Sequence, residues 1–401
     1  MMNNLPDVDS CIGCGVCQVV CPVRCIEMKE DCNGFKQVVI SPDKCVHCLK
    51  CERYCPVLSL KKENLGNKKD PTVFACAHLN KNIQKKSSSG GFFPALCETF
   101  FSLFKEEAFI YGAVLQNDFS VCHEKAVTLE ETKKFSGSKY LQSDIRVVLG
   151  SIKMDLELGK YVLFSGTPCQ VAAVYSFLKK KYDRLYTCEV ICHGVPSSYH
   201  FDIQRRWFEV KYDSILRRID FRSKKICWQI PTTKYVFQSG KIHYFRSEEN
   251  SFMNAFYSAL NLRKSCYTCP YASLPRIADM TIGDFWGYEK SVIFNKKEIA
   301  RGISLILCNN EKGNKLFEKA AYKLKVEKSS LDKAISGNVH IVRPVQRSSR
   351  ERDLFLLDVH NLSIEQINKK YGKIPFRKKI GIFMGTYLMK CFFYLKNVYA
   401  K

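Results

Sequence analysis

The stretch CIGCGVCQVVCP (residues 11–22) is followed, 34 positions further along the chain, by CVHCLKCERYCP (residues 45–56). Both stretches have the pattern Cys-x-x-Cys-x-x-Cys-x-x-x-Cys-Pro, so this part of the chain is an internal duplication. Thiolate sulfur is a soft ligand, and gaps of two residues let three thiolates converge on one iron–sulfur cluster from a short loop. The proline after each last cysteine fixes φ and removes a backbone donor, which turns the chain away from the cluster.

The spacing is that of bacterial ferredoxins with two clusters, in which the fourth cysteine of each run binds the cluster of the other run. We therefore predict two 4Fe-4S clusters, one held by Cys11, Cys14, Cys17 and Cys55 and the other by Cys45, Cys48, Cys51 and Cys21. Structural zinc sites and a disulfide scaffold are the alternatives. A zinc knuckle would use two pairs of ligands per site, whereas each run here has four cysteines and ends in Cys-Pro. Cys25 and Cys32 fall outside the pattern and are expected to be bystanders.

A hairpin is predicted between the two runs. Ile26 and Met28 on one side of Asn33-Gly34, and Val38 and Ile40 on the other, alternate with polar residues, and Asn-Gly is the strongest short hairpin signal. Residues 1–60 are therefore expected to form a small α+β, two-cluster ferredoxin-like domain.

The cysteine content and the first residues bear on the cellular compartment. The first ten residues (MMNNLPDVDS) have neither the basic start nor the apolar stretch of a secretory signal. With 21 cysteines and no export signal, the thiols are expected to be reduced ligands rather than disulfides. We therefore expect a cytoplasmic protein.

The positive charge belongs to the part of the chain after the cysteine runs. The formal net charge is +24, yet residues 1–60 carry six Lys or Arg and seven Asp or Glu, which leaves 57 basic and 32 acidic residues for the remainder. Such a surface would attract acidic electron carriers, an anionic cofactor or anionic lipid, and a plain solvated surface is also compatible with it.

Several function classes lack their sequence signatures. There is no helix-turn-helix signature, zinc finger or basic repeat with interleaved aromatics, so no nucleic-acid partner is expected. Nothing matches the Rossmann glycine fingerprint or the phosphate-binding P-loop. A Cys-x-x-x-Cys-x-x-Cys triplet, the usual mark of radical enzymes built on adenosylmethionine, does not occur either.

A charged, Gly- and Pro-containing linker (61–71) is expected to lead into a second domain (72–330). This domain begins with a strand at 72–79. A Ser/Gly-rich loop, Ser87-Ser88-Ser89-Gly90-Gly91, then opens an amphipathic helix that extends to residue 104. Such a loop is an anion site when the first helical amides are unpaired, and otherwise a plain helix start.

Two consecutive strand–turn–helix units predict an α/β domain with a mainly parallel sheet. The first has a strand at 161–164 and a helix at 171–181, and the second has a strand at 185–191 and a helix at 199–212. Both turns would lie at the carboxyl edge of the sheet, where open α/β folds bind ligands.

Cysteines in these turns predict a third 4Fe-4S cluster. Cys169 lies in the first turn, Cys192 lies in the second, and Cys266-x-x-Cys269-Pro270 supplies a pair with ligand spacing in a later loop. Cys188 competes for a ligand position. The remaining cysteines are expected to be small buried apolar residues.

The C-terminal segment (331–401) is basic, and it has no acidic residue after Glu365. Its apolar part, 380–395, is interrupted by Lys390 and is too short for a confident membrane span. It is expected to be an interfacial helix on an anionic membrane surface, which would make the protein peripheral on the inner face of the membrane, or else a helix that closes the domain.

Seven motifs in the same order resemble those of the beta-subunit family of coenzyme F-420 hydrogenases and dehydrogenases. They are SSSGG (87–91), GSKY (137–140), GTPCQ (166–170), CHGVPS (192–197), FRSK (221–224), CYTCP (266–270) and ADMTIGDFWG (278–287). The resemblance covers residues 1 to about 290. It implies a flavoenzyme in which FAD exchanges electrons with iron–sulfur clusters.

The resemblance also implies site residues. The FAD phosphates would lie against Ser87, Ser88, Ser89, Gly90 and Gly91 and against Gly137, Ser138 and Lys139, with Gly166 and Thr167 close by. Asp279 would bind the cofactor, Asp284 would orient the flavin or substrate, and His193 would relay a proton. A helix or turn cap is the alternative for the two aspartates, and a packing role is the alternative for His193. The deazaflavin coenzyme F-420 is a further candidate ligand.

The sequence thus predicts an iron–sulfur flavoprotein oxidoreductase that exchanges electrons with a ferredoxin or flavodoxin-like carrier. One alternative is a non-catalytic electron-transfer subunit of a larger redox complex. Another is a membrane-associated redox partner in polysaccharide or cell-envelope metabolism, which only the basic tail supports.

Overall fold

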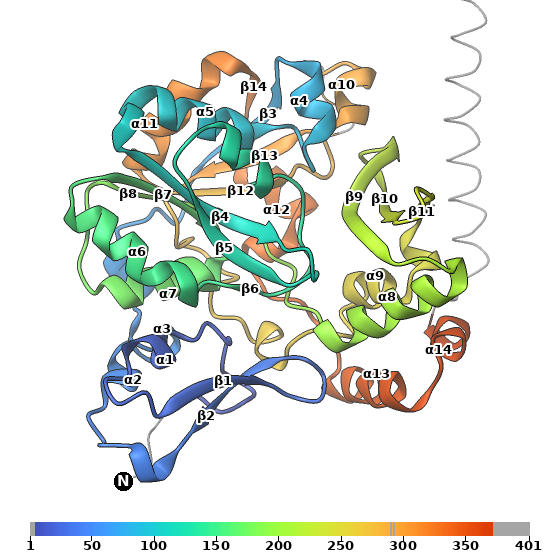
Figure 1. Ribbon diagram of the computed structural model, residues 1–401. Coiled ribbons are helices and arrows are strands. Elements are labelled where there is room, and N and C mark those ends of the chain that lie inside the picture. Colours follow the sequence, from blue (N-terminus) through green and yellow to red (C-terminus); the bar gives the residue numbers. More distant parts are fainter. Residues whose placement is uncertain (1–4, 289–290, 292, 372–401) are drawn as a thin grey trace, which may run out of the picture.

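The computed structural model describes residues 5–288, 291 and 293–371, and its N-terminal module is built around one hairpin (Figure 1). Strands β1 (Ile26–Glu30) and β2 (Lys36–Ile40) pair antiparallel, with Ile26 opposite Ile40 and Met28 opposite Val38. The hairpin therefore has its turn at the predicted Asn33-Gly34. Four short elements complete the module: α1 (Val16–Val20), which contains Cys17, η1 (Pro42–Lys44), α2 (Lys50–Arg53), which contains Cys51, and α3 (Pro56–Ser59).

A nine-stranded sheet forms the centre of the body, in the order β14-β3-β13-β12-β8-β7-β4-β5-β6. Its strands are β3 (Thr72–His78), β4 (Ala108–Leu115), β5 (Val121–Ala126), β6 (Ser143–Asp144), β7 (Tyr161–Gly166), β8 (Leu185–Val190), β12 (Met280–Asp284), β13 (Ser304–Cys308) and β14 (Leu324–Ser329).

The direction of the strands changes from the centre of this sheet to its edges. The four neighbours β12, β8, β7 and β4 run parallel to one another. In contrast, β13 pairs antiparallel with β12 and β3, β14 pairs antiparallel with β3, and β5 pairs antiparallel with β4. The α/β class is confirmed, and the parallel arrangement holds at the centre of the sheet. Its antiparallel flanks were not predicted.

Helices cover both faces of the sheet because successive strand residues point to opposite sides. Leu163 of β7 packs in the same core cluster as α5 (Phe92–Phe104) and α11 (Glu311–Ala320), whereas Val162 and Phe164 pack with α6 (Arg146–Glu157) and α7 (Pro168–Leu178). Figure 1 shows the N-terminal module below α6 and α7. The side chains of Ile12 and Val16 belong to the α6–α7 core, so the module shares a hydrophobic core with the body.

A second, antiparallel sheet lies beside the central one and was not predicted. It consists of β11 (Ile242–Phe245), β10 (Ile230–Phe237) and β9 (Leu216–Cys227), and it packs with α8 (Ser198–Tyr212) and α9 (Ser251–Tyr257). The remaining α-helices are α4 (Lys81–Lys86), α10 (Lys296–Arg301), α12 (Leu331–Gly337), α13 (Ser349–Asn361) and α14 (Ile364–Tyr371). Short 3-10 turns complete the fold: η2 (Lys62–Leu65), η3 (Lys105–Glu107), η4 (Glu130–Phe135), η5 (Ser247–Glu249), η6 (Lys264–Cys266), η7 (Ala321–Lys323) and η8 (Val339–Ile341).

Part of the predicted C-terminal tail belongs to the folded body. Residues of α12 pack against the central sheet, and residues of α13 and α14 pack with α8 and α9. The predicted interfacial helix (380–395) lies outside the described residues. No helix in the described part of the chain is long and apolar enough to cross a membrane.

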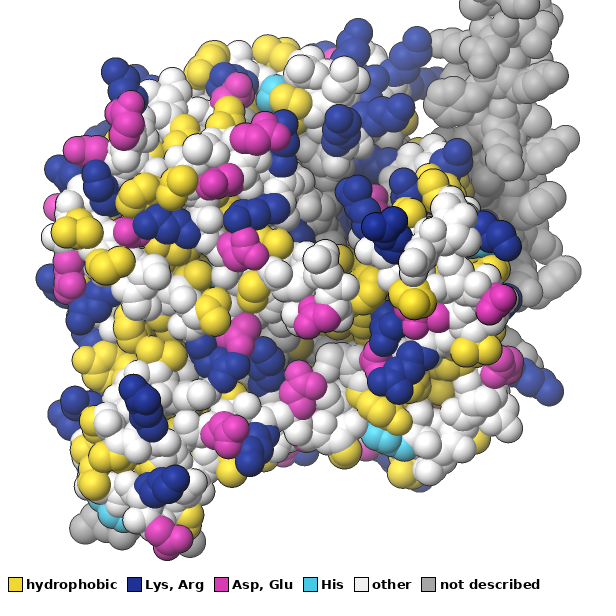
Figure 2. All heavy atoms as spheres, in the orientation of Figure 1, with side chains coloured by type: hydrophobic (Ala, Val, Ile, Leu, Met, Phe, Trp, Pro, Cys, Tyr) yellow, Lys and Arg dark blue, Asp and Glu magenta, His cyan; other side chains and the backbone are white. Residues whose placement is uncertain are grey.

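Basic side chains gather on one region of the body. Figure 2 shows Lys and Arg over α4, α10 and the β9–β11 sheet, at the upper right of this view. The exposed basic residues of these elements and their connecting loops include Lys81, Lys85, Lys86, Arg217, Arg218, Lys225, Lys241 and Lys297. Lys and Arg side chains also lie over the rest of the shown face, so the positive charge predicted for the body is not confined to this region.

The tip of the β1–β2 hairpin docks on the body at the start of α8. The hydroxyls of Ser197 and Ser198 donate to the carbonyls of Asn33 and Gly34, at 2.6 and 2.7 Å. Gly34 has φ of +77°, and a Cβ there would overlap Ser198 Oγ and lie 2.7 Å from the amide nitrogen of Tyr199. The close approach of the two backbones therefore requires glycine at this turn.

Replacing Gly34 with alanine should loosen this docking. The positive φ alone should cost about 1–2 kcal/mol, and the overlap with α8 should add about 1–3 kcal/mol. The matched control is Gly240→Ala, because Gly240 has φ of +81° and no described atom would lie within 4 Å of a Cβ there. Thermal unfolding of the two variants should show a clearly larger drop in Tm for G34A. Equal drops would mean that the hairpin tip contributes nothing to docking.

Candidate functional site

The eight cysteines of the two Cys-Pro runs form two groups, and each group surrounds a small cavity. The first group is Cys11, Cys14, Cys17 and Cys55, and the second is Cys21, Cys45, Cys48 and Cys51. The last cysteine of each run has thus crossed to the other group, as the spacing predicts. Cys25 lies beside the second group, with its Sγ 3.4 Å from Cys21 Sγ. The ligand role of these cysteines stays a prediction.

The donor set fits iron–sulfur clusters. Each group supplies four thiols, and the Gly13 amide already donates to Cys11 Sγ at 3.4 Å. Burial raises the pKa of Cys14 well above its ordinary value and that of Cys17 to about 12, so ligand binding would release protons from these thiols. Among the described residues, no three His, Cys, Asp or Glu side chains converge closely enough to hold a single metal ion.

The structure brings the four cysteines of the predicted third site together from three loops. Cys169 begins α7 after β7, Cys192 follows β8, and the 266–269 loop brings Cys266 and Cys269. Burial, and then the charges of Cys169, Cys266 and Cys269, raises the pKa of Cys192. The Val195 amide donates to Cys266 Sγ at 3.3 Å. We call Cys169, Cys192, Cys266 and Cys269 the third quartet, and the two groups of the module the first and second quartets.

Cys188 does not belong to the third quartet. It is fully buried in β8, within the core cluster that contains Cys97 and Cys308 on the α5 side of the sheet. Burial and the charge of Cys97 raise its pKa, and none of the quartet cysteines is among the groups that act on it. Its surroundings are those of a buried apolar residue.

A cavity of about 600 Å³ opens next to the third quartet, at the carboxyl ends of β7 and β8. This volume lies within the range of about 300–1,000 Å³ that is usual for cofactor sites. Its wall includes Cys169 and Cys192 of the third quartet and Cys14 of the first. Most of the predicted cofactor and catalytic residues also line it, namely Ser87, Ser88, Ser89, Gly91, Gly137, Ser138, Lys139, Gly166, Thr167, His193 and Asp284.

Two of the predicted FAD-binding segments meet on the cavity wall. The Ser138 hydroxyl donates to Ser88 Oγ at 3.1 Å, which joins the 136–140 segment to the serine loop. Behind them, α5 begins at Phe92 with no side-chain cap, and Phe92 and Phe93 also line the cavity. The positive end of a helix of thirteen residues thus borders the cavity, which suits an anionic group.

Lys139 lies on the wall with its ammonium group already engaged. Its Nζ donates to the carbonyls of Lys134, Phe135 and Ser136, at 3.3, 2.7 and 3.0 Å. Burial lowers its pKa to about 7. The side chain therefore fixes the loop that carries Gly137 and Ser138, and a direct contact with a phosphate would require it to exchange a partner.

Asp284 is held by two donors and in turn orients an arginine. The Arg222 guanidinium forms an ion pair with Asp284, and Trp228 Nε1 donates to the same carboxylate at 2.6 Å. Arg222 lines the cavity, and its buried Nε–H has no partner among the described residues. Among these groups, only the Arg222 Nε–H is thus left without a partner, whereas both carboxylate oxygens of Asp284 accept hydrogen bonds.

His193 also lies on the wall, with both ring nitrogens engaged. Its Nε2–H donates to the Phe256 carbonyl at 2.9 Å, which leaves Nδ1 to accept from His340 Nε2–H at 3.0 Å. Burial, and then the charge of His340, lowers the pKa of His193 to about 4, so the ring is neutral near pH 7. A proton relay through His193 would require one of these bonds to break.

Two predicted cofactor residues do not line the cavity. Asp279 accepts from the amide and hydroxyl of Thr187, at 2.8 and 3.0 Å, and from Asn310 at 2.9 Å. Its carboxylate joins β8 to the loop before α11, which is a packing role. The amide of Gly90 donates to Ser304 Oγ at 2.8 Å, so this glycine holds the serine loop against β13.

Arg222 was missed by the sequence analysis. It lies within the quoted FRSK motif, whose lysine, Lys224, donates to the Ser89 carbonyl at 2.6 Å beneath the serine loop. A basic pair in a strand next to aromatic residues gives no local signal of its own. Only the packing of β9 against the cavity shows that one basic side chain points inward and the other supports the loop.

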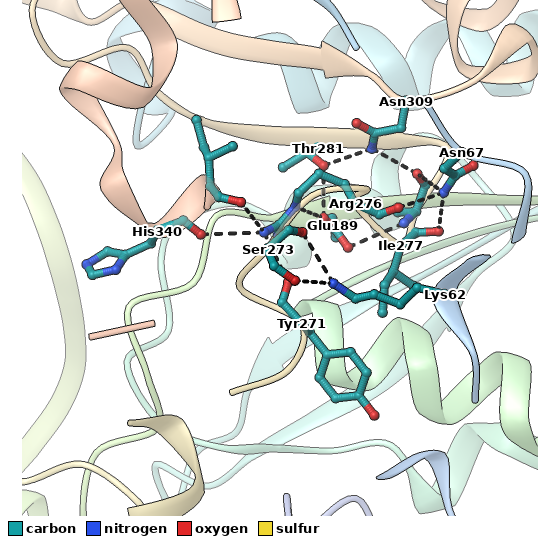
Figure 3. A network of polar contacts seen from close by, with 12 residues as sticks. Lys62, Asn67, Glu189, Tyr271, Ser273, Arg276, Ile277, Thr281, Asn309 and His340 are labelled. Carbon is teal, nitrogen blue, oxygen red and sulfur yellow. Dashed lines mark hydrogen bonds and ion pairs between the residues drawn. The ribbon is translucent and has the colours of Figure 1, made fainter. Parts of the chain in front are cut away.

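A buried ion pair positions the loop that carries Cys266 and Cys269 (Figure 3). Arg276 Nε donates to Glu189 Oε1 at 2.5 Å, and both side chains are at most 1 % exposed. Arg276 Nη1 donates to the Tyr271 carbonyl at 3.1 Å, and Asn67 Nδ2 donates to the Ile277 carbonyl at 2.7 Å. The loop is therefore tied both to β8 and to the segment that leaves the N-terminal module.

The comparisons with known proteins concern both parts of the chain. Residues 159–334 match the family described as the C terminus of the coenzyme F420 hydrogenase/dehydrogenase beta subunit, and residues 10–58 match the 4Fe-4S dicluster domain. An uncharacterized protein of Methanocaldococcus jannaschii is 23% identical over 343 residues, which cover 79% of this chain and 88% of the relative. A chain of the F420-reducing NiFe hydrogenase complex from Methanosarcina barkeri aligns with a TM-score of 0.44 and 16% identity, over 75% of this chain and 91% of that chain.

Replacing Arg276 with methionine should destabilise the protein by about 3–5 kcal/mol, because it leaves Glu189 buried and unpaired. Lys315→Met is the control, because Lys315 and Glu311 form an exposed pair 3.9 Å apart whose loss should cost at most about 0.5 kcal/mol. Chemical unfolding of both variants measures the difference. A small effect of R276M would mean that the ion pair does not hold the loop.

Replacing Cys266 with serine should lower the iron content to about two thirds, from about twelve to about eight atoms per chain, if four cysteines hold each 4Fe-4S cluster. Cys188→Ser is the matched control, and it should leave the iron content unchanged. Iron analysis and absorption spectra of protein purified without oxygen make this measurement. Unchanged iron in C266S would rule out a third cluster bound by this quartet.

Proposed function

Because the chain belongs to the coenzyme F420 hydrogenase/dehydrogenase beta-subunit family, we propose that it is an iron–sulfur flavoprotein oxidoreductase. In this proposal it moves electrons between 4Fe-4S clusters and FAD, and so between a one-electron carrier and a two-electron substrate. The family and the dicluster domain support the general function, which is that of an iron–sulfur electron-transfer protein of an oxidoreductase family. The flavin and the third cluster are the parts proposed here.

One observation carries the proposal: cysteines of two quartets and the predicted flavin-binding segments lie on the wall of one cavity. Cys14 of the first quartet and Cys169 and Cys192 of the third line it together with the serine loop. Chains of electron carriers need their members close to one another and to the reacting group. The order second quartet, first quartet, third quartet and cavity provides such a sequence of sites.

The residues on the cavity wall fit a flavin dinucleotide. The serine loop, Gly137, Ser138 and the start of α5 would hold its phosphates, and Tyr140, Phe256, Tyr257 and Trp286 offer aromatic surface for its rings. FAD, when bound, can exchange two electrons with a substrate and single electrons with iron–sulfur clusters. The deazaflavin coenzyme F420 is a candidate for the substrate.

The ion pair between Arg222 and Asp284 would orient the ligand. The Arg222 guanidinium lies 5.3 Å from the ring of Trp286, which stacks on Trp228 at 4.6 Å. This stack and the carboxylate hold the guanidinium in one place on the cavity wall, where its positive charge would attract a carbonyl or a phosphate of the ligand. Asp284 acts here as a positioning residue rather than as a proton acceptor.

The second quartet is the proposed contact site for an electron carrier such as a ferredoxin or flavodoxin. Val46 and Leu49 stand between its cysteines and are 60% and 44% exposed. The exposed side chains of Lys44 and Lys50 flank them and would attract the acidic surface of a carrier. An apolar patch with a polar border is the usual form of a contact site.

An alternative is favoured by the family description, which names a beta subunit. The chain would then transfer electrons within a larger redox complex and would not convert a substrate by itself. Turnover of a carrier by the purified chain, in the absence of other subunits, separates the two functions. The association with a membrane and a role in polysaccharide or envelope metabolism depend on residues outside the described part of the chain.

The iron and flavin content of protein purified without oxygen tests the proposal directly. About twelve irons and one FAD per chain are expected for three 4Fe-4S clusters and one flavin. About eight irons without flavin would reduce the function to electron transfer through the N-terminal module.

Blocking the cavity should remove the flavin and leave the iron. Ala113 lies on the cavity wall and is only partly buried, so Ala113→Phe would fill the space with a ring. We expect the flavin content to fall at least about tenfold, since overpacking of this kind costs more than about 1.4 kcal/mol. Val147→Phe, on the exposed side of α6, is the control. Full flavin content in A113F would place the flavin elsewhere.

A further inference from the structure

Two buried polar side chains, Arg263 and Tyr271, lie between the first and the third quartet. Both side chains are 3% exposed. Arg263 precedes Cys266 by three residues, and Tyr271 follows Cys269 by two, so both belong to the loop that carries half of the third quartet. From this loop they face the N-terminal module.

Arg263 contacts the first cysteine loop of the module. Its Nη1 donates to the Cys11 carbonyl at 3.4 Å, and its Nη2 donates to Gln142 Oε1 at 2.8 Å. Gln142 Nε2 in turn donates to the carbonyls of Ile12 and Gly13, each at 3.1 Å. A Cβ at Gly13 would lie 2.7 Å from Arg263 Nη2, so the loop has glycine at the point of closest approach.

The charge of Arg263 has no compensating carboxylate among the described residues. Three other arginines are at least nine-tenths buried, and each has an acidic partner: Arg222 pairs with Asp284, Arg276 with Glu189 and Arg352 with Asp353. Its positive charge acts on the thiols of Cys169 and Cys266, whose pKa values it lowers against the larger effect of burial. The buried Nε–H of Arg263 has no hydrogen-bond acceptor in the described part of the chain.

Tyr271 shows the same pattern. Its buried hydroxyl has no hydrogen-bond partner within the described residues. After burial, the groups that raise its pKa are Cys169 and Cys269 of the third quartet and Cys14 and Cys55 of the first. Tyr271 also shares a core cluster with Cys14 of the first quartet and with Cys169 and Cys269 of the third, so its ring lies between the two quartets.

A buried donor without an acceptor costs free energy, and a buried unpaired cation costs more. Two such groups on the loop that carries Cys266 and Cys269 indicate that an acceptor with negative charge belongs beside it. The thiolates and the sulfurs of iron–sulfur clusters are such acceptors, and hydrogen bonds to these sulfurs are among the factors that set the reduction potential. The orphaned donors thus fit clusters in both quartets.

We propose that Arg263 and Tyr271 are positioning residues that hold the first and third clusters in electrostatic contact and raise the reduction potentials of both. The positive charge and the two donors stabilise the added electron on either side of the domain boundary. The two potentials are thereby raised together, which keeps electron transfer between the module and the body possible in both directions. This inference rests on the third cluster of the proposed function.

The test is a redox titration of the purified holoprotein, followed by electron paramagnetic resonance of each cluster. Tyr271→Phe removes a single oxygen atom, and Arg263→Met removes the charge and its donors. Both should shift the first and third clusters to lower potential, with the larger shift in R263M. The second cluster, which neither side chain reaches, serves as an internal reference and should not move.

Two further variants separate the causes. Arg263→Lys keeps the charge and should shift the potentials less than R263M does. Tyr267→Phe is the matched control on the same loop, because the Tyr267 hydroxyl donates to the Ala259 carbonyl at 2.7 Å and is not available to a cluster. It should leave all the potentials unchanged.

The outcomes distinguish this inference from the proposed function. If the wild-type protein shows only two clusters by resonance and iron content, the third cluster fails and the inference with it. If three clusters are present and Y271F and R263M leave every potential in place, the inference alone is refuted. Equal shifts of all three clusters would also refute it, because they would indicate a general change in the protein.

Discussion

The burial of cysteine sulfur is the constraint on which the rest of this structure depends. Thiols in the interior resist ionisation, as the raised pKa values of Cys14, Cys169 and Cys192 show. Groups of thiolates there need cations, amide donors or bound metal to be stable. The elements that meet around the quartets supply them: the amides of Gly13 and Val195, and the guanidinium of Arg263. The module and the body are therefore joined where sulfur has to be stabilised.

The same constraint accounts for the rigid link between module and body. The module contributes side chains to the α6–α7 core, its hairpin tip bonds to the start of α8, and Asn67 of the following segment bonds to the loop after Cys269. Electron transfer between sites in different domains depends on a fixed separation. Three independent contacts fix the distance between the first quartet and the third. One of these contacts, at Asn67, lies within the predicted linker (61–71).

Short sequence patterns predicted the parts of the fold that depend on residues close together in the chain. The crossed grouping of Cys21 and Cys55 follows from cysteine spacing, and the hairpin follows from alternation around Asn33-Gly34. The third quartet could be predicted from the sequence because the carboxyl ends of parallel strands meet at one edge of the sheet. In contrast, the antiparallel pairing of β3 with β13 and with β14 joins residues more than 200 positions apart, such as Cys76 with Ser304. The inward direction of Arg222 and the engagement of Asp279 likewise depend on tertiary packing that no local pattern contains.

The net charge of the chain changes when the cysteines that would bind clusters are counted as thiolates. The formal net charge of +24 treats every cysteine as neutral, and all of the basic excess lies outside the module. Twelve thiolates around clusters would lower this charge, and each added electron would lower it further, close to the centre of the protein. Buried arginines with their own carboxylates, such as Arg276 and Arg222, are already neutralised and can offset little of it. An unpaired cation between two quartets therefore stabilises the stored electrons best. The basic surface of the body adds positive potential around the protein.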